Sequence, residues 1–223
     1  MRKGRLPVEL YGTLGASCAR REILERMFQA GMTGARLNLS HTTLRECAAL
    51  LEEGFWPAAR RMGVEASMII DLQGPELRVG RLKEPVELKE GEQAVLGAGG
   101  LPVPQRVVEA ACPGDRISLD DSALQLTVRE KLPGHLVCRV ERGGVLKSRK
   151  SLALLGREVA APTLTEKDRD NLALAERYGV THILQPFVRG REDILTLRSA
   201  LAEYGLDRVQ IMAKIENQRG LEK

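Results

Sequence analysis

Lys214 and Glu216 are the two residues whose types and spacing point most directly to chemistry. They follow the apolar run 211–213 and stand two positions apart. Positions i and i+2 of a strand point the same way, so both side chains can address one site. A cation beside a carboxylate is either a surface ion pair or a phosphate-binding ammonium with a metal-binding carboxylate, a combination used in phosphoryl transfer. The pair alone leaves both interpretations open.

Three further polar clusters fall at or just after the carboxyl ends of predicted strands, at residues 36–41, 71–78 and 185–189. The carboxyl ends of parallel strands are where ligands collect in barrels and in open α/β sheets. Arginine and lysine side chains suit phosphate oxygens, whereas hard oxygen ligands for cations are available from Asn38, Ser40, Asp71 and Glu216. The clusters together predict a site for a phosphorylated ligand with metal ions.

The elements that must position these residues alternate between strands and helices in two stretches. The first stretch predicts strands at 8–13, 34–39 and 65–71, with helices at 20–30 and from 43 toward 62. The second stretch predicts a helix at 165–178, a strand at 181–184, a helix at 192–204 and a strand that ends at Lys214. Thr43 with Glu46, and Thr165 with Asp168, have the spacing of helix capping boxes.

Residues 81–156 have a different sequence pattern from both stretches. Short alternating segments are interrupted there by Gly, Pro and Asp, which predicts a small all-β domain inserted between two βα regions. The expected division is therefore a discontinuous domain at 1–80 and 157–223, with an inserted domain at 81–156. The discontinuous part supplies about five βα strands, whereas a closed parallel barrel has eight.

Composition narrows the class of protein. The 223 residues include 34 Lys and Arg against 30 Asp and Glu, a net charge of +4 that does not demand nucleic acid. Aromatic residues are only 3%, so stacking platforms for single strands are scarce. No segment approaches the length of a membrane span. The four cysteines are widely separated and lack metal spacing, which is typical of reduced thiols in a cytoplasmic protein.

Four segments resemble pyruvate kinase, in the same order and at similar separations: 31–41, 71–78, 162–168 and 214–218. The resemblance covers the whole chain but only the first half of that enzyme. It implies an α/β fold, with a partial (β/α)8 TIM barrel of about five βα units and an inserted small all-β barrel that closes as a lid. The implied activity is phosphoryl transfer from phosphoenolpyruvate to ADP, giving pyruvate and ATP in glycolysis.

The resemblance also implies roles for individual residues. Arg36 would grip the phosphate of phosphoenolpyruvate, and Lys214 would stabilise the phosphoryl group in flight. Glu216 would be one of two acidic ligands of Mg²⁺ or Mn²⁺. A K⁺ site would use Asn38, Ser40, Asp71 and the backbone carbonyl of Leu72. The nucleotide would contact Asn38, Leu39, Ser40, His41, Arg78 and Lys150.

The sequence departs from the family pattern in ways that bear on activity. Gln73 stands where a lysine is usual, which removes a positive charge near the nucleotide. The second acidic magnesium ligand, a substrate-gripping threonine and a regulatory domain would all follow Lys223. The 223-residue chain is therefore expected to have little or no turnover by itself.

Alternative interpretations remain at this stage. The chain could be a non-catalytic protein that binds phosphoenolpyruvate or nucleotide, or a half-barrel that associates through its open strand edges. We therefore expect a homo-oligomer or a partner that completes the barrel. Another phosphoenolpyruvate-using barrel enzyme would not explain the β insertion. Each residue taken alone also has a purely structural interpretation. Arg36 could be a surface arginine, Asp71 an acidic residue of a turn, and Arg78 and Lys150 exposed basic residues.

Overall fold

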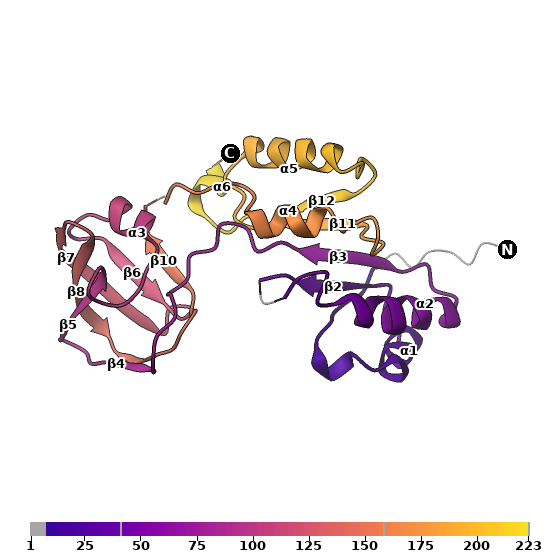
Figure 1. Ribbon diagram of the computed structural model, residues 1–223, viewed down its shortest axis with the longest axis horizontal. Helices are drawn as coiled ribbons and strands as arrows, with labels where there is room; N and C mark the ends of the chain where they lie inside the picture. The colour runs from indigo at the N-terminus through magenta and orange to yellow at the C-terminus, as the bar shows by residue number, and fades with distance from the viewer. Residues whose placement is uncertain (1–7, 41, 158, 223) are drawn as a thin grey trace. The chain divides into compact units, whose positions relative to one another are not determined.

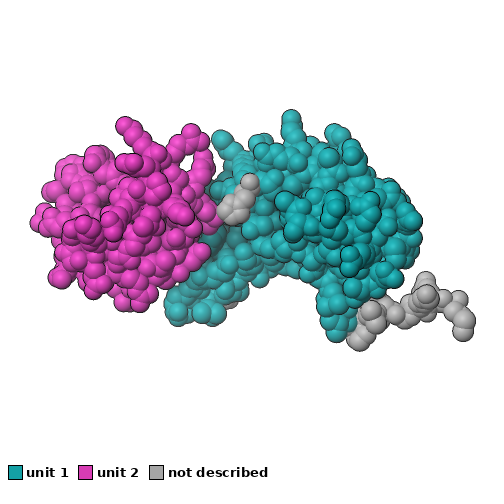
Figure 2. Space-filling model, turned by 90° about the horizontal axis from the view of Figure 1, so that it is seen from below, with its two compact units in different colours: residues 1–75, 162–223 teal, residues 76–161 magenta. Residues whose placement is uncertain are grey.

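The computed structural model describes residues 8–40, 42–157 and 159–222, which form two compact units (Figure 2). Unit 1 contains the described residues up to Pro75 and those from Pro162 onward, and unit 2 contains Glu76–Ala161. The boundaries expected from the sequence lie five residues inside unit 2 at each end. Each unit has its own hydrophobic core.

Unit 1 is built on a five-stranded parallel sheet with the order β1-β2-β3-β11-β12. Its strands are β1 (Tyr11–Thr13), β2 (Gly34–Asn38), β3 (Ser67–Asp71), β11 (His182–Gln185) and β12 (Gln210–Ala213). The register places Asn38 directly beside Asp71. The carboxyl ends of β2 and β3 therefore meet at one edge of the sheet.

The two faces of this sheet have different chemistry because side chains alternate along each strand. Ala35 and Leu37 of β2 are buried in the core of unit 1, as are Met68 and Ile70 of β3. The intervening residues of β2, Arg36 and Asn38, are only partly buried. Alternation thus places the polar side chains of β2 on the face opposite the hydrophobic core.

Helices supply the other side of that core. They are α1 (Arg21–Gln29), α2 (Trp56–Met62), α4 (Glu166–Leu172) and α5 (Arg191–Glu203). The short α6 (Gln218–Glu222) has no buried residue, and a 3₁₀ turn lies at Ala16–Cys18. Leu24 of α1 and Leu197 of α5 are fully buried in the same cluster as the strand residues. Figure 1 shows α1 and α2 beside β2 and β3, and α4 and α5 beside β11 and β12.

Two predicted helices differ from those observed. The segment expected to be helical from residue 43 begins with turns and has two α-helical residues at 48–49. It continues as a π-helix at Leu50–Phe55 and is α-helical again from Trp56. Pro57 lacks the amide hydrogen that an α-helix would use there, and a wider turn precedes it. The helix expected at 165–178 ends at Leu172 and is followed by turns that lead to Gly179, which has a left-handed φ of +68°.

Unit 2 contains a five-stranded antiparallel sheet with the order β10-β6-β7-β8-β5 and a two-stranded sheet of β4 and β9. Its elements are β4 (Val86–Leu88), β5 (Gln93–Gly97), α3 (Gln105–Ala110), β6 (Arg116–Leu119), β7 (Leu124–Leu132), β8 (His135–Arg142), β9 (Gly144–Leu146) and β10 (Leu152–Leu155). The all-β expectation for this unit is wrong in one respect, because α3 is helical. Pro104 precedes α3, and Val107 and Val108 are buried in the core of unit 2.

Candidate functional site

Arg36 and Asp71 form an ion pair across β2 and β3. The Nε atom of Arg36 donates to Oδ2 of Asp71 at 3.1 Å, and its Nη2 atom contacts the same oxygen. The Nη1 atom of Arg36 donates to Oγ1 of Thr13 at 3.2 Å, so β1 also orients the guanidinium. Only 3% of the Asp71 side chain is exposed, against 30% for Arg36. The carboxylate is therefore buried while the cation remains accessible.

Lys214 joins this pair to Glu216. Its Nζ atom lies 3.5 Å from Oδ1 of Asp71 and 3.3 Å from Oε1 of Glu216. The contact to Asp71 is an ion pair without hydrogen-bond geometry, since Oδ1 has no hydrogen-bond donor. Oε2 of Glu216 accepts from the backbone nitrogen of Phe187 at 3.2 Å. We call Arg36, Asp71, Lys214 and Glu216 the Asp71 cluster.

The Asp71 cluster brings together residues that the sequence placed near the ends of different strands. Its members come from the middle of β2, the end of β3 and the segment after β12. Lys214 and Glu216 lie just beyond the last strand residue, Ala213, and remain neighbours there. Two cations and two carboxylates alternate, so an incoming phosphate would compete with Asp71 and Glu216 for the cationic groups.

The turns that follow β2 and β3 are held close to the Asp71 cluster. The backbone nitrogen of Ser40 donates to Oδ1 of Asn38 at 3.1 Å. The backbone nitrogen of Leu39 donates to the carbonyl of Asp71 at 2.9 Å, and that of Leu72 donates to the carbonyl of Leu184 at 3.1 Å. Of the four residues expected at the K⁺ site, Asn38 and Asp71 are thus the last residues of β2 and β3, and Ser40 and Leu72 lie in the segments directly after them. His41, expected at the nucleotide site, lies outside the described residues.

Arg78 and Lys150 belong to unit 2, where they lie on neighbouring segments. Arg78 forms a bridge with Ser151, and both its Nε and Nη2 atoms lie 2.8 Å from the carboxylate oxygens of Glu76. The Nζ atom of Lys150 lies 2.8 Å from Oδ1 of Asp120. Each cation expected at the nucleotide therefore already has an acidic partner.

Asp120 opens an unusual turn beside Lys150. Asp120, Asp121 and Ser122 all have left-handed φ values, of 51°, 52° and 72°. L-residues rarely adopt this conformation, and such residues concentrate at functional sites. Ser151 stabilises the turn, because its hydroxyl donates to Oδ1 of Asp121 at 2.7 Å and accepts from the Asp121 backbone nitrogen at 2.8 Å. Sequence inspection did not single out Asp120, Asp121 or Ser122.

A second buried acid in unit 1, Asp193, holds the segment that follows Phe187. Asp193 accepts from the hydroxyl of Thr163 at 2.6 Å and from Nη2 of Arg189 at 2.7 Å. Burial alone would raise the pKa of Asp193, but the bonds from Arg189 and Thr163 outweigh it and lower this pKa to about 2. Asp193 is thus ionised at neutral pH and fixes the start of α5. Its only sequence signal was its place in the first turn of a predicted helix.

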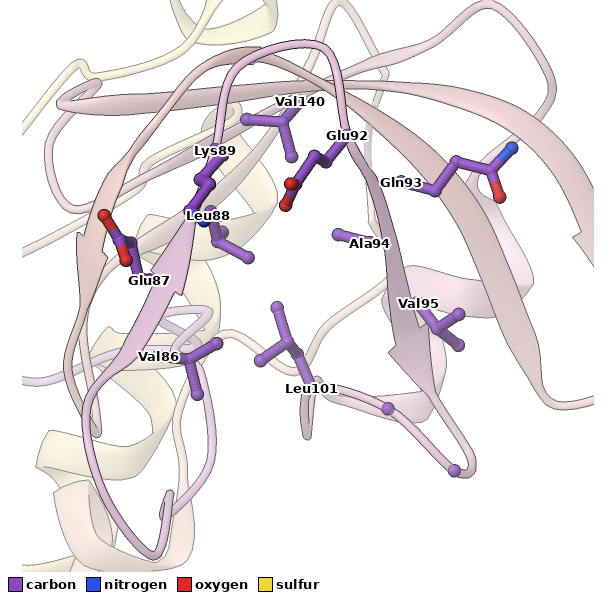
Figure 3. Close-up of a pocket in the computed structure, with 12 residues that line it drawn as sticks. Val86, Glu87, Leu88, Lys89, Glu92, Gln93, Ala94, Val95, Leu101 and Val140 are labelled. Carbon is purple, nitrogen blue, oxygen red and sulfur yellow. The ribbon is translucent and has the colours of Figure 1, made fainter.

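A cavity of about 410 Å³ lies in unit 2 between β4 and β5 (Figure 3). Leu88, Ala94, Leu101 and Val140 are among its apolar lining residues, and Figure 3 shows the side chain of Glu92 pointing toward it. None of the residues expected at the catalytic site lines this cavity. It is therefore separate from the Asp71 cluster.

The donor set at the two turns suits the cations expected from the sequence. Oxygen atoms of Asn38, Ser40 and Asp71 are hard ligands. The buried Oδ1 atom of Asp71 accepts no hydrogen bond, so a bound cation could satisfy it. Within the described ranges no group of three or more His, Cys, Asp or Glu side chains is arranged to hold a metal ion. Glu216 is thus a single carboxylate, which suits Mg²⁺ only with phosphate or water oxygens as further ligands. No described helix is long and apolar enough to cross a membrane.

Comparison with known proteins identifies related sequences. The family described as "Pyruvate kinase, barrel domain" matches residues 7–223. A pyruvate kinase from Aeropyrum pernix is 34% identical over 222 residues, covering 98% of this chain and 48% of the relative. A pyruvate kinase from Geobacillus stearothermophilus is 33% identical, covering 94% of this chain and 37% of the relative. The chain thus spans at most about half the length of these relatives.

Proposed function

The chain belongs to the pyruvate kinase family, and from that membership we propose that the Asp71 cluster serves phosphoryl transfer between phosphoenolpyruvate and ADP. The observation that carries the proposal is the convergence of Arg36 and Lys214 on the buried carboxylate of Asp71, with Glu216 paired to Lys214. The chain spans about half the length of its relatives, so the activity of a complete enzyme is part of the proposal.

The parallel sheet of unit 1 is proposed to be a partial eight-stranded barrel. Its strand order follows the chain, and helices cover one face, as in the successive βα units of such barrels. Unit 2 is then the inserted domain, which leaves after β3 and returns before α4. This assignment explains why adjacent strands β3 and β11 are far apart in sequence.

Arg36 and Lys214 are proposed to bind the transferred phosphoryl group. Asp71 holds the Arg36 guanidinium, and Glu216 holds the Lys214 ammonium, before substrate arrives. Fixed cations at the place where negative charge is redistributed stabilise the transition state without reorganising solvent. The accessible fraction of Arg36 and of Lys214, 30% each, leaves both cations open to an anionic ligand.

Metal ions complete the proposed site. Asn38, Ser40, Asp71 and the Leu72 carbonyl would hold K⁺, and Glu216 would contribute to Mg²⁺ or Mn²⁺. Bound cations would neutralise phosphoryl charge and orient the transferring group. The segment after β2 would also contact the nucleotide through Asn38, Leu39, Ser40 and His41, and the family resemblance implies the same role for Arg78 and Lys150.

A second candidate function is favoured by the strand edges. Among the described residues, β1 and β12 each pair with one strand only, and Ile211 and Met212 of β12 are half-buried. Such edges can pair with another chain. The chain would then be a binding or self-associating relative, and the loss of a cation at Gln73 would be tolerated.

Calorimetric titration of phosphoenolpyruvate into the 223-residue chain, with Mg²⁺ and K⁺ present, tests the leading proposal. We expect binding that weakens by about tenfold or more in Arg36→Met, because a charge-assisted contact is lost. Arg21→Met is the matched control, since Arg21 pairs with Glu25 on the surface. An absence of binding, or equal binding by Arg36→Met and the wild type, would reject the assignment.

Two measurements separate the two candidate functions: a coupled enzymatic assay of pyruvate production, and sedimentation of the isolated chain. Turnover of the isolated chain is expected to be negligible, with binding retained. A clean monomer at working concentration would exclude self-association through β1 and β12. A stable dimer without phosphoenolpyruvate binding would favour the second candidate.

A further inference from the structure

The first turn of α4 contacts the turn that follows β3. Asp168 is fully buried, and its Oδ1 atom accepts from the backbone nitrogens of Gln73 at 3.0 Å and Gly74 at 3.3 Å. Its Oδ2 atom accepts from the backbone nitrogen of Thr165 at 2.9 Å and from the Thr165 hydroxyl at 2.7 Å. One carboxylate therefore ties the helix start to the residues that directly follow Asp71 and Leu72.

The same helix contacts the turn that follows β2. The Nζ atom of Lys167 donates to the carbonyl of Leu39 at 2.7 Å. One turn further along, Oδ1 of Asn171 accepts from the backbone nitrogen of Leu44 at 2.8 Å, and Asn171 is 1% exposed. Residues from one short helix thus hold two turns that lie far from it in sequence.

We propose that Asp168 and Lys167 are positioning residues that set the two turns of the cation site against each other. Asp168 fixes the β3 turn, which directly follows Asp71 and Leu72, and Lys167 fixes the β2 turn, which directly follows Asn38 and contains Ser40. The identity of the ligand, K⁺, rests on the proposed function. The positioning itself rests on the contacts of α4.

The chemistry of Asp168 fits this role better than a capping role alone. Gln73 and Gly74 offer only N–H donors at this point, so both need an acceptor, and a buried donor without one is costly. The capping box would need only the Oδ2 side of the carboxylate. The Oδ1 side is therefore engaged entirely with the β3 turn. Cation ligands must be held to within a fraction of an ångström, which such rigid contacts provide.

Amide hydrogen exchange in the full 223-residue chain tests the proposal. In Asp168→Ala we expect the amides of Gln73 and Gly74 to exchange about tenfold faster or more, after correction for global stability. Thr165→Ala is the matched control. It removes the capping hydroxyl from Oδ2 and leaves both Oδ1 contacts, so these two amides should exchange as in the wild type.

Lys167→Met provides an independent test if Asp168→Ala does not fold. It removes the donor to Leu39, and we expect faster exchange at Leu39 and Ser40, with little change at Gln73 and Gly74. Wild-type exchange at the tested turn in a folded Asp168→Ala or Lys167→Met variant would overturn the proposal. Equal acceleration in Thr165→Ala and Asp168→Ala would also overturn it, because capping alone would then explain the effect.

Titration of the thermal midpoint with K⁺, at constant ionic strength maintained with tetramethylammonium, links the positioning to the ligand. We expect Asp168→Ala to need about tenfold more K⁺ than the wild type for the same shift, and Thr165→Ala to need the wild-type amount. If the wild type shows no response to K⁺, the proposed cation site fails, while amide exchange still decides whether α4 positions the turns.

Discussion

The Nε atom of Arg36 lies 3.1 Å from Oδ2 of Asp71, although 35 residues separate the two in sequence. Register creates this contact. Strands β2 and β3 pair in parallel, and alternation puts both side chains on the face opposite the hydrophobic core. A shift of one residue in either strand would move one partner to the other face.

Replacing Asp71 by Asn tests how much this carboxylate stabilises the fold. The change removes the charge that balances Arg36 and Lys214, both of which are partly exposed. We expect the free energy of unfolding to fall by about 1–3 kcal/mol in urea titrations. Glu25→Gln is the control, because Glu25 pairs with Arg21 near the surface, and its loss should be below about 1 kcal/mol. Equal effects would show that burial of Asp71 has no energetic weight.

Gly179 and Gly63 provide a matched pair for a steric prediction. Their φ values are +68° and +67°, but a Cβ atom on Gly179 would lie 2.8 Å from the Trp56 ring, whereas Gly63 has nothing within 4 Å. Gly63→Ala should cost about 1 kcal/mol for the left-handed backbone alone. Gly179→Ala should cost about 1–3 kcal/mol more, because the ring must move. Chemical denaturation of both variants measures the difference, and equal losses would contradict the contact.

Replacing Asp193 by Asn should change the dependence of stability on pH. The folded pKa of Asp193 is about 2, against an ordinary value of 3.8, so its ionised form stabilises the fold. That contribution, about 2 kcal/mol, is nearly complete above about pH 5 and declines as the pH falls toward 2. The stability difference between wild type and Asp193→Asn should therefore shrink to about half its neutral-pH value near pH 3. A difference that is constant from pH 7 to pH 3 would contradict the lowered pKa.

The thiols of unit 2 should differ in reactivity. Burial raises the pKa of Cys138 to about 12, whereas Cys112 is partly exposed. At pH 8 only about one Cys138 thiol in ten thousand would be ionised, so iodoacetamide should label Cys112 and spare Cys138. Mass spectrometry of peptides reports the labelling, with urea-unfolded protein as the control. Rapid labelling of Cys138 in the folded chain would show that unit 2 opens readily.

Much of the fold could be predicted from the sequence because its signals are local. The alternating pattern at 34–39 predicts β2, and the Thr165 and Asp168 spacing predicts the start of α4, where both bonds of the capping box are present. The ends of elements were less predictable. The apolar residues after Leu172 continue a helical pattern but pack in turns.

Site residues could be predicted where they belong to a sequence motif. Residues whose role depends only on tertiary contacts could not. Arg36, Asp71, Lys214 and Glu216 stood at strand ends, and the structure brings them together. Thr13 could not be found in this way, because its link to Arg36 depends on the pairing of β1 with β2. The contact of Asp168 with Gln73 spans 95 residues, and a capping box gives no sign of it.

The pairing of β3 with β11 has a consequence for how the chain folds. The contact of Met68 with Thr181 spans 113 residues, of which the 86 residues from Glu76 to Ala161 form unit 2. Closing a loop of 113 residues costs only about 1 kcal/mol more in chain entropy than closing a loop of the 27 residues that remain without unit 2. If unit 2 folds first, its two ends are already held, and most of that difference disappears. Early folding of the insertion would therefore speed the assembly of the sheet that surrounds it.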